Sequence, residues 1–464
     1  MDAFVSRKRK RDEGLQKTEH LPAPPQEEES TDFKLALLAS LHPAADEATL
    51  LEALLASDGS VEYASTYLKY DPGGVQSTLA SPRKRANAAI GYQSSLSSYC
   101  LKPNENTARK PLVKKGKTLY LFSPEDIEQH TPCSIIHNFL PAQQANALLQ
   151  QLLDETPTYQ SLEFKLFDRV VTSPHTFCFY VNSLAEAEEQ RTQYIYDGRK
   201  VENKNVQQST PEMLAAVPQV EEAVNAEVRR RTALFQPDGQ KLKYQSPNPW
   251  KANTAFVNCY AGPQQHVGYH SDQLTYLGPR AVIGSLSLGV AREFRVRKVL
   301  AHDDTLFKAD GSLADAQGQI SIHLPHNSLL VMHAEMQEEW KHSIAAATSI
   351  VPHPVAGNKR LNITYRFYKP ALHPRYTPKC RCGVPCVLRC ATRKKESRGR
   401  YMWMCHVHYV PGQDGCSFFQ WAEFDEDGEP PWKERVKQDE EILRAAREAA
   451  AGVAEEKRPL DKNK

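Results

Sequence analysis

Residues 360–366 read Arg-Leu-Asn-Ile-Thr-Tyr-Arg, and this alternation of polar and apolar side chains is the strongest constraint on the fold. Because successive side chains of a strand point to opposite faces, a strand here presents Arg360, Asn362 and Arg366 on one face and a hydrophobic row on the other. Two guanidinium groups facing a β-walled cavity require a buried anion, since unpaired charges there cost several kcal/mol. A dicarboxylate such as 2-oxoglutarate would satisfy them. A salt-bridged edge strand fits the same pattern.

Length and charge set broad limits. The chain has 464 residues, which predicts about two to four domains. Its 58 basic and 56 acidic residues give a net charge of +2, so any nucleic-acid binding has to use local patches. The N-terminus is charged from Arg7 onward, and no apolar run approaches the roughly 18 residues of a membrane span. We therefore expect an intracellular, soluble protein without a signal peptide.

The N-terminal 70 residues divide into a polar tail and a helical segment. Residues 1–30 are polar and should be disordered, and the basic run Arg7–Arg11 predicts import into the nucleus, although basic clusters also occur in disordered tails. Residues 31–70 contain three short amphipathic patterns, which predict a small helical bundle. Leu41-His42-Pro43 and the segment 58–68 resemble a CUE or UBA-like module, and this resemblance implies weak ubiquitin binding. A plain packing bundle fits the degenerate motif nearly as well.

Residues 71–111 lack hydrophobic periodicity and are interpreted as a linker. Within it, Gln93–Cys100 follows a basic triplet and resembles a sliding-clamp-binding box, but Cys100 replaces the second aromatic residue, so a simple linker is the alternative. Dense hydrophobic segments begin near Leu112. We expect a helix at 141–155 and strands at 161–171 and 176–181.

Non-haem iron oxygenases bind Fe(II) with two histidines and one carboxylate, in the sequence form His-x-Asp followed downstream by His. The chain contains two such triplets, His270-Ser271-Asp272 and His302-Asp303-Asp304. The second lies in a polar, turn-rich stretch and is interpreted as an exposed loop. The first follows a strand-like segment, 254–260, in which Asn258 and Tyr260 share a face.

Several motifs follow one another in a characteristic order: Asn258-x-Tyr260, His270-x-Asp272, Ala281–Leu288 before Gly289, Asn327–Met332, His342, and Arg360-x-Asn362-x-Thr364-x-Arg366. This order resembles that of AlkB-like 2-oxoglutarate/Fe(II) dioxygenases, over about residues 112–371. By position, the resemblance implies that iron is bound by His270, Asp272 and His342. It implies that 2-oxoglutarate is held by Asn258, Tyr260, Arg360, Asn362 and Arg366. His326 and His333 are alternative candidates for the second histidine ligand, but the sequence context of His342 favours His342.

The resemblance also implies a jelly-roll core that removes methyl groups oxidatively from N-alkylated bases in DNA, with flipped or single-stranded bases as substrates. RNA demethylation, and a non-catalytic reader that binds ubiquitin and single strands, remain alternatives. Substrate choice is open because Leu274 stands where repair members of the family commonly carry an acidic residue. The nucleotide-recognition lid of the family falls on a region containing Phe164, Phe167, Arg169, His175 and Tyr180, for which ordinary packing is the competing interpretation.

Six of the ten cysteines lie between residues 380 and 416, which in a reducing compartment indicates a metal site. Four of them suit tetrahedral zinc: Cys380, Cys382, Cys405 and Cys416. His406 or His408 is the rival ligand. Spacing and the Phe-Phe-x-Trp element at 418–421 resemble a GRF-type zinc finger, which implies single-strand binding. Basic and aromatic side chains suited to that binding are Arg400, Tyr401, Trp403 and Phe419.

The expected fold is therefore multidomain α+β. We expect a polar tail (1–30), a helical module (31–70), a linker (71–111), a jelly-roll dioxygenase domain (112–371), a zinc finger (378–425) joined by a flexible linkage that raises its local concentration on single strands, and a charged tail (426–464).

Overall fold

In this computed structural model, the structure describes residues 31–70, 118–183, 206–299 and 318–442, apart from 44, 58, 167–168 and 393. It also describes residues 185, 195–196, 199–200 and 445. The basic run Arg7–Arg11, the segment Gln93–Cys100 and the second His-x-Asp triplet, at 302–304, lie outside these residues. Within the described part of the chain, no helix has the length and apolar character needed to cross a membrane.

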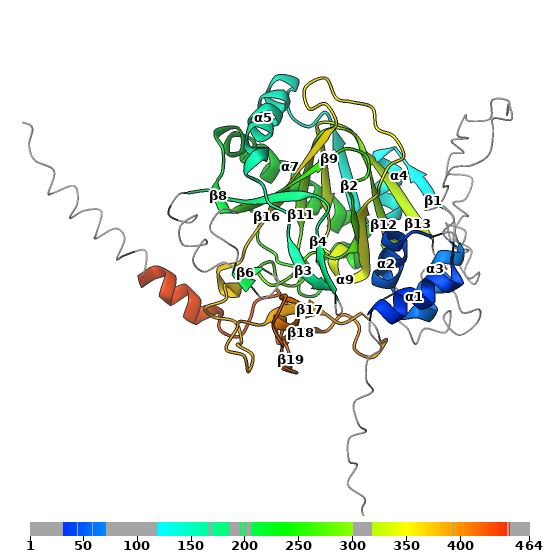
Figure 1. The fold of residues 1–464 in the computed structure, drawn as a ribbon. Helices are drawn as coiled ribbons and strands as arrows, with labels where there is room; N and C mark the ends of the chain where they lie inside the picture. Colours follow the sequence, from blue (N-terminus) through cyan, green and yellow to red (C-terminus); the bar gives the residue numbers. More distant parts are fainter. Residues whose placement is uncertain are drawn as a thin grey trace, which may run out of the picture.

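Two facing sheets form a jelly-roll-like core (Figure 1). The larger sheet contains, in spatial order, β2 (Cys133–His137), β14 (Ser328–Met332), β11 (Ile283–Gly289), β16 (Lys359–Arg366), β9 (Thr254–Ala261), β5 (Thr176–Val181) and β8 (Val206–Gln208). The smaller sheet contains β1 (Thr118–Leu121), β13 (Gln319–Leu324), β12 (Arg292–Lys298), β15 (Trp340–Ile344) and β10 (Val267–His270). Neighbouring strands are antiparallel except at the edges, where β1 pairs parallel with β13 and β5 with β8.

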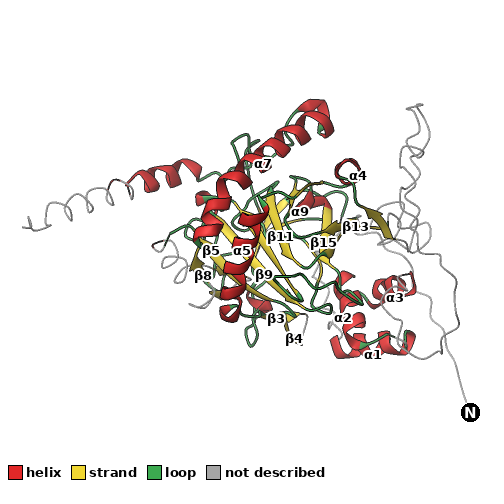
Figure 2. Cartoon of the chain, turned by 90° about the horizontal axis from the view of Figure 1, so that it is seen from above, coloured by secondary structure: helices red, strands yellow, loops and turns green. Residues whose placement is uncertain are grey.

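Two helices, α5 (Ala142–Glu155) and α7 (Pro211–Phe235), cover the outer face of the larger sheet (Figure 2). The apolar stripe of α5 includes Leu148, Leu149 and Leu152, all fully buried, because a spacing of three to four residues keeps side chains on one helix face. Helix α7 begins where Thr210 accepts a hydrogen bond from Met213 N, which satisfies one free donor of its first turn.

The predicted strand at 360–366 is confirmed and forms the centre of the larger sheet as β16. Its apolar residues Leu361, Ile363 and Tyr365 pack beneath α5 and α7 in one hydrophobic cluster. Its polar side chains occupy the opposite face, which looks toward the smaller sheet, because side chains alternate along a strand. The helix cover therefore fixes which face of β16 looks toward the smaller sheet.

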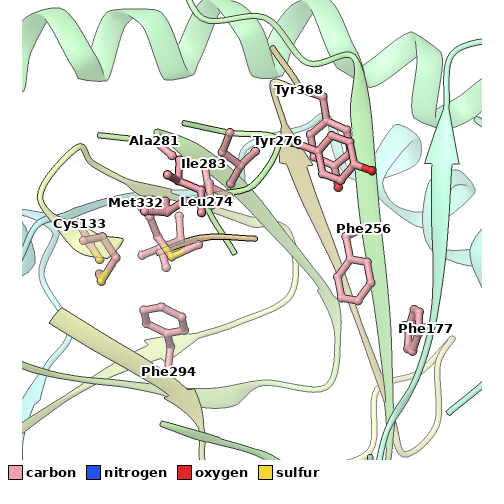
Figure 3. Packing of buried hydrophobic residues seen from close by; sticks show 14 of the residues in the cluster. Cys133, Phe177, Phe256, Leu274, Tyr276, Ala281, Ile283, Phe294, Met332 and Tyr368 are labelled. Atoms are coloured by element: carbon pink, nitrogen blue, oxygen red, sulfur yellow. The ribbon is translucent and has the colours of Figure 1, made fainter. Parts of the chain in front are cut away.

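The space between the two sheets is a second hydrophobic cluster (Figure 3). Phe177, Phe256 and Met332 enter it from the larger sheet, and Phe294 enters it from the smaller one. At the turn from β11 to β12, Gly289 has a φ of 85°, and a Cβ atom there would lie 2.4 Å from Lys359 O. Only glycine fits this crossing.

A helical module of α1 (Thr31–Leu41), α2 (Glu47–Ala56) and α3 (Val61–Tyr70) lies beside the core and has its own small hydrophobic cluster. Helix α2 lies against β10, where the Glu52 side chain comes within 4.0 Å of the Cβ position of Gly268. Glu47 forms an ion pair of 2.8 Å with Arg169. Arg169 belongs to the hairpin β3 (Glu163–Leu166) and β4 (Arg169–Thr172), which replaces the single strand predicted at 161–171.

Shorter elements complete the described fold. They are α4 (Pro124–His130), α9 (Met336–Glu339), the strand pair β6 (Ile195–Tyr196) and β7 (Arg199–Lys200), and the 3-10 turns η3 (Thr156–Thr158), η4 (Pro237–Gly239), η5 (Pro370–Leu372) and η6 (Val407–Tyr409). Helix α9 is the connection between β14 and β15, and it lies beside the loop that follows β10.

Residues 378–425, here called the cysteine module, contain a sheet of β17 (Val387–Cys390), β18 (Tyr401–Met404) and β19 (Phe419–Trp421). Most of its buried hydrophobic residues, Leu388, Tyr401 and Trp403 among them, belong to the same hydrophobic cluster as the space between the two large sheets. The module is thus packed against the core, which differs from the predicted flexible linkage. The following segment also starts on the core, since Trp432 Nε1 donates to Ala371 O at 2.7 Å and Val436 is buried.

Candidate active site

Antiparallel pairing of β10 with β15 brings two of the predicted iron ligands together. His270 and His342 stand opposite each other in the register, and their ring centroids are 4.3 Å apart. Asp272 Oδ1 lies 3.7 Å from His270 Nε2 and 3.6 Å from His342 Nε2. The ligand atoms of the three side chains all lie within 4.8 Å of one another, a convergence suited to one metal ion.

The electrostatics of this triad favour a metal-binding protonation state. Burial alone would raise the pKa of Asp272, but Arg366 and the two histidines hold it well below its usual range. Burial and the neighbouring His342 lower the pKa of His270 to about 4. Asp272 is therefore a carboxylate and His270 is a neutral imidazole, which are the forms that bind metal.

Two neighbours orient the imidazoles. His270 Nδ1 lies 2.9 Å from Gly268 O, and a carbonyl can only accept, so Nδ1 carries the proton and Nε2 presents its lone pair toward Asp272. Phe294 stacks on His342 with ring centroids 5.4 Å apart. The local chain geometry thus fixes both rings before any metal binds.

The inward face of β16 carries a connected polar network. Arg360 Nη2 donates to Ser287 Oγ and to Asn362 Oδ1, both at 2.8 Å. Asn362 Oδ1 also accepts from Ser285 Oγ at 3.0 Å, and Asn362 Nδ2 donates to Thr364 Oγ1 at 2.8 Å. Ser285 and Ser287 come from β11, the strand next to β16, and were not identified from the sequence.

Arg360 has hydrogen-bond donors that a ligand could use. It is 1% exposed, and its Nε and Nη1 have no hydrogen-bond partner among the described residues. Within the part of the chain that the structure describes, no carboxylate forms an ion pair with it. Burial lowers the pKa of Arg360 to about 10, while Tyr260, whose ring lies 5.4 Å from the guanidinium, raises it. A carboxylate of 2-oxoglutarate would supply the missing acceptors, so the residues present fit this co-substrate.

Arg366 has a different environment from Arg360. Its Nη2 donates to Asp272 Oδ2 at 3.0 Å, and its guanidinium lies 5.1 Å from the ring of Phe256. The two arginines predicted to bind 2-oxoglutarate therefore differ. Arg360 has two donors without a partner among the described residues, whereas Arg366 is paired with Asp272, a predicted iron ligand.

The remaining predicted co-substrate residues, Asn258 and Tyr260, lie on β9 directly opposite Asn362 and Arg360. Asn258 Oδ1 is buried without a hydrogen bond. Tyr260 stacks on His175, with ring centroids 4.9 Å apart. All eight predicted iron and co-substrate residues thus come from β9 and β16 of the larger sheet, β10 and β15 of the smaller sheet, and the loop after β10.

Other predicted residues have mixed outcomes. Tyr180 is fully buried and shares a 3.0 Å hydrogen bond with Tyr159 in the cluster under α5 and α7, so it is a packing residue. Leu274 is also part of the hydrophobic core. His333, a rival of His342, lies 3.0 Å from Ser134 Oγ instead of at the triad. The side chains of Phe164 and Phe167 lie outside the described residues.

The cysteine module holds a second convergence of ligand atoms. The sulfur atoms of Cys380, Cys382, Cys405 and Cys416 all lie within 4.8 Å of one another. Burial would raise the pKa of Cys416, but the backbone N–H of Phe418 and the neighbouring thiols lower it to about 6. His406, a predicted rival ligand, instead stacks on Tyr409 with centroids 4.1 Å apart. The four sulfurs fit a closed tetrahedral site.

The four predicted single-strand contacts divide into two pairs. Tyr401 and Trp403 are 3% and 1% exposed and face the core, so neither ring is available for base stacking. Phe419 is 50% exposed, and Arg400 lies 3.9 Å from the ring of Trp421. The prediction is therefore wrong for Tyr401 and Trp403, because alternation along β18 turns these two side chains inward.

Comparisons with known proteins match the part of the chain that carries this site. The 2OG-Fe(II) oxygenase superfamily matches residues 132–366. The chain is 30% identical to the DNA oxidative demethylase ALKBH2 of Arabidopsis thaliana over 122 residues, 25% of this chain and 37% of that protein. It is 29% identical to the human alpha-ketoglutarate-dependent dioxygenase alkB homolog 3 over 126 residues, 27% of this chain and 39% of that protein. The matches therefore span less than half of these relatives.

Among solved structures, OsALKBH1 aligns with a TM-score of 0.34 and 16% identity, covering 51% of this chain and 99% of that one. A Trichoplax adhaerens prolyl hydroxylase in complex with a peptide fragment aligns with a TM-score of 0.29 and 11% identity, covering 52% of this chain and 87% of that one. The superfamily match covers half of the chain and contains every strand that carries the His270, Asp272 and His342 triad, so this chain belongs to the 2OG-Fe(II) oxygenase superfamily.

Proposed function

We propose that the chain is an Fe(II)- and 2-oxoglutarate-dependent dioxygenase that demethylates N-alkylated bases in DNA. The observation that carries the proposal is the presence of two features in the same core: a convergent His270, Asp272 and His342 triad, and a buried Arg360 with two unused donors on β16, the strand whose Arg366 bonds to Asp272. Relatives whose names include DNA oxidative demethylase support the choice of substrate.

In this proposal each group of the chain has a defined task. His270, Asp272 and His342 would hold the iron, at which dioxygen is the oxidant: one of its oxygen atoms would hydroxylate the methyl carbon and the other would enter succinate as 2-oxoglutarate loses CO2. Arg360 binds one carboxylate of 2-oxoglutarate, and Ser287 and Asn362 fix its guanidinium for this purpose. Arg366 balances the charge of Asp272 and restricts its rotation. The hydroxymethyl product on a base nitrogen then breaks down to formaldehyde and the repaired base.

Succinate release from a methylated oligonucleotide tests the activity, with His270→Ala as the inactive variant. We expect turnover by the unchanged chain and none by the variant. Comparing methylated single-stranded DNA, duplex DNA and RNA separates the DNA enzyme from the RNA alternative. Absence of turnover on every alkylated substrate, with retained single-strand binding, would instead support a non-catalytic reader.

The cysteine module is proposed to bind one zinc ion through Cys380, Cys382, Cys405 and Cys416 and to contact single strands. The support is the convergence of the four sulfurs and the exposed Phe419 beside the Arg400 and Trp421 pair. Cationic and aromatic groups together suit sequence-tolerant single-strand binding, since they offer phosphate contacts and stacking.

Three further proposals concern partners and location. Ubiquitin binding by the helical module is supported by its resemblance to CUE modules, and Leu37 and Leu41 are 40% and 51% exposed there. A titration of labelled ubiquitin with Leu41→Asp as the control tests it. Nuclear import through Arg7–Arg11 is tested by the location of a fluorescent fusion with these residues replaced by alanine. Binding of a sliding clamp by Gln93–Cys100 is tested with the corresponding peptide.

A further inference from the structure

The loop that carries Asp272 is anchored to the cysteine module at its middle. We call residues 271–280 the ligand loop. Leu388 N of β17 donates to Thr275 Oγ1 at 3.3 Å in a buried contact, three residues after Asp272. Leu274 and Tyr276 of the ligand loop lie in the same hydrophobic cluster as Leu388, and Figure 3 shows both side chains in that cluster. The ligand loop is thus part of the surface on which the cysteine module rests.

A second route to the same loop runs through α9. Gln337 Oε1 accepts a hydrogen bond from Asp272 N at 2.6 Å, which fixes the backbone at the metal ligand itself. The next residue, Glu338, accepts from Arg280 N at 2.8 Å, at the far end of the ligand loop. Glu338 Oε1 also accepts from the hydroxyl of Tyr401 at 2.8 Å, on β18 of the cysteine module. Glu338 therefore contacts both the ligand loop and the cysteine module, and its neighbour on α9, Gln337, contacts the loop at Asp272.

The side chains that form these hydrogen bonds are buried. Gln337, Glu338 and Tyr401 are 3%, 2% and 3% exposed. A buried carboxylate needs hydrogen-bond donors, so the loss of the Tyr401 hydroxyl would leave Glu338 short of a partner and free to move with α9. Arg280 has a φ of 53°, a left-handed conformation that a non-glycine residue holds only when its surroundings enforce it. Glu338 and Glu339 supply that restraint through Arg280 N and Arg280 Nη1.

We propose that the cysteine module is a positioning element of the iron site. Tyr401, through Glu338 and Gln337, and Leu388, through Thr275, hold the ligand loop so that Asp272 faces His270 and His342. None of these residues touches the metal, so they act through Asp272. The inference rests on the proposed iron site, because Asp272 is treated as a ligand. It gives the module a task separate from nucleic-acid contact: a folded, metal-loaded module supports the affinity of the core for iron.

The test measures metal binding by the full chain without any nucleic-acid substrate. Mn²⁺ is titrated in the presence of 2-oxoglutarate and the free ion is followed by electron paramagnetic resonance, because Mn²⁺ prefers oxygen and nitrogen ligands over thiolates. The variants are Tyr401→Phe, Gln337→Met and their combination. Tyr409→Phe is the matched control, since it removes a hydroxyl from the same module beside His406. Zinc content and the circular dichroism spectrum are recorded for each protein.

We expect Gln337→Met to weaken Mn²⁺ binding by about 10- to 100-fold, as is usual for outer partners of metal ligands. Tyr401→Phe should weaken it by about 3- to 10-fold with zinc retained, since it lies two side chains from Asp272. Tyr409→Phe should have no effect. Because Glu338 and Gln337 are neighbours on α9 and hold the same loop, the effects of the two variants should not simply multiply in the combination.

Several results would overturn the proposal. Unchanged Mn²⁺ affinity in zinc-loaded Tyr401→Phe would reduce Tyr401 to a packing residue, even if the melting temperature falls. Multiplied effects in the double variant would refute the connection through α9. If Tyr401→Phe does not retain zinc, Thr275→Val replaces it, removing the other contact from the core side, and unchanged affinity there refutes the proposal. Failure of the unchanged chain to bind Mn²⁺ would instead refute the iron site.

Discussion

Replacing Arg360 by methionine should stabilise the ligand-free protein and abolish its response to 2-oxoglutarate. In the folded state burial lowers the pKa of Arg360 to about 10. At about 1.4 kcal/mol for each pKa unit, this lowering corresponds to about 3 kcal/mol of destabilisation while the group is charged. The bonds from Arg360 to Ser287 and Asn362 offset part of this cost, and Asn362 Oδ1 keeps a bond from Ser285 in the variant.

We therefore expect the free energy of unfolding of Arg360→Met to rise by about 1–3 kcal/mol without ligand, in line with replacements of other buried charges. For a domain of this size the melting temperature should rise by about 2–4 °C per kcal/mol. In the unchanged chain, Mn²⁺ with 2-oxoglutarate at 100 times its dissociation constant should add about 2.7 kcal/mol. The variant should lose most of this gain, because the carboxylate has lost its partner.

Urea unfolding followed by circular dichroism, with and without the ligands, measures both effects. Arg292→Met is the matched control: this arginine is also buried, but it donates to four backbone carbonyls, those of Gly262, Pro263, Gln265 and Ala345. Its removal should destabilise the protein, since each buried acceptor left unpaired costs about 1–3 kcal/mol. An Arg360→Met protein that is less stable than the unchanged chain, or that responds fully to 2-oxoglutarate, would refute this reasoning.

Further predictions concern the other groups described above. Burial, together with Arg231 and Arg230, lowers the pKa of His333 to about 3. Above the unfolded-state pKa of 6.5 the imidazole is neutral in both states, and as the pH falls below 6.5 its protonation favours the unfolded chain, so the free energy of unfolding decreases. Between pH 6.5 and 5 the unchanged chain should lose about 1.5–2 kcal/mol relative to His333→Gln in urea unfolding, and parallel curves would contradict this. Cys405→Ser should lose the bound zinc in elemental analysis, whereas Cys390→Ser, outside the four-sulfur group, should retain it. Phe419→Ala should weaken binding of a single-stranded oligonucleotide by about 1–3 kcal/mol in fluorescence anisotropy at fixed salt, and an unchanged affinity would exclude stacking on this ring.

Sequence patterns predicted the site better than they predicted the surfaces around it. The alternation along β16 was decisive because one face of the strand is covered by helices and the other looks toward the smaller sheet. Odd-numbered and even-numbered residues therefore each have a single environment. Ser287, a partner of Arg360, and Ser285, a partner of Asn362, could not be identified from the sequence because their identity depends on which strand pairs with β16. Likewise, Gln337 reaches Asp272 only through the tertiary fold.

Other elements were misread for local physical reasons. Helix α7 was not predicted, since its sequence contains Pro218, a residue that disfavours helix interiors, and several charged residues, although Val220 and Val224 are fully buried. The hairpin β3 and β4 looked like one strand because the residues between them, 167 and 168, include no glycine or proline to mark a turn. In β18, composition indicated aromatic residues but could not tell which face meets the core.

The helical module and the cysteine module differ in how they contact the core, and these contacts indicate which module can affect the iron site. The helical module has its own hydrophobic cluster, and its ion pair to the hairpin joins Arg169 to a Glu47 side chain that is 70% exposed. Such a surface pair contributes about 0–1 kcal/mol and is screened by salt, so it holds that module on the core only weakly. The cysteine module instead shares the core cluster and reaches the ligand loop through the buried Tyr401 and Leu388. A packed, buried connection has few alternative arrangements, so disorder in the cysteine module must extend to the loop that holds Asp272.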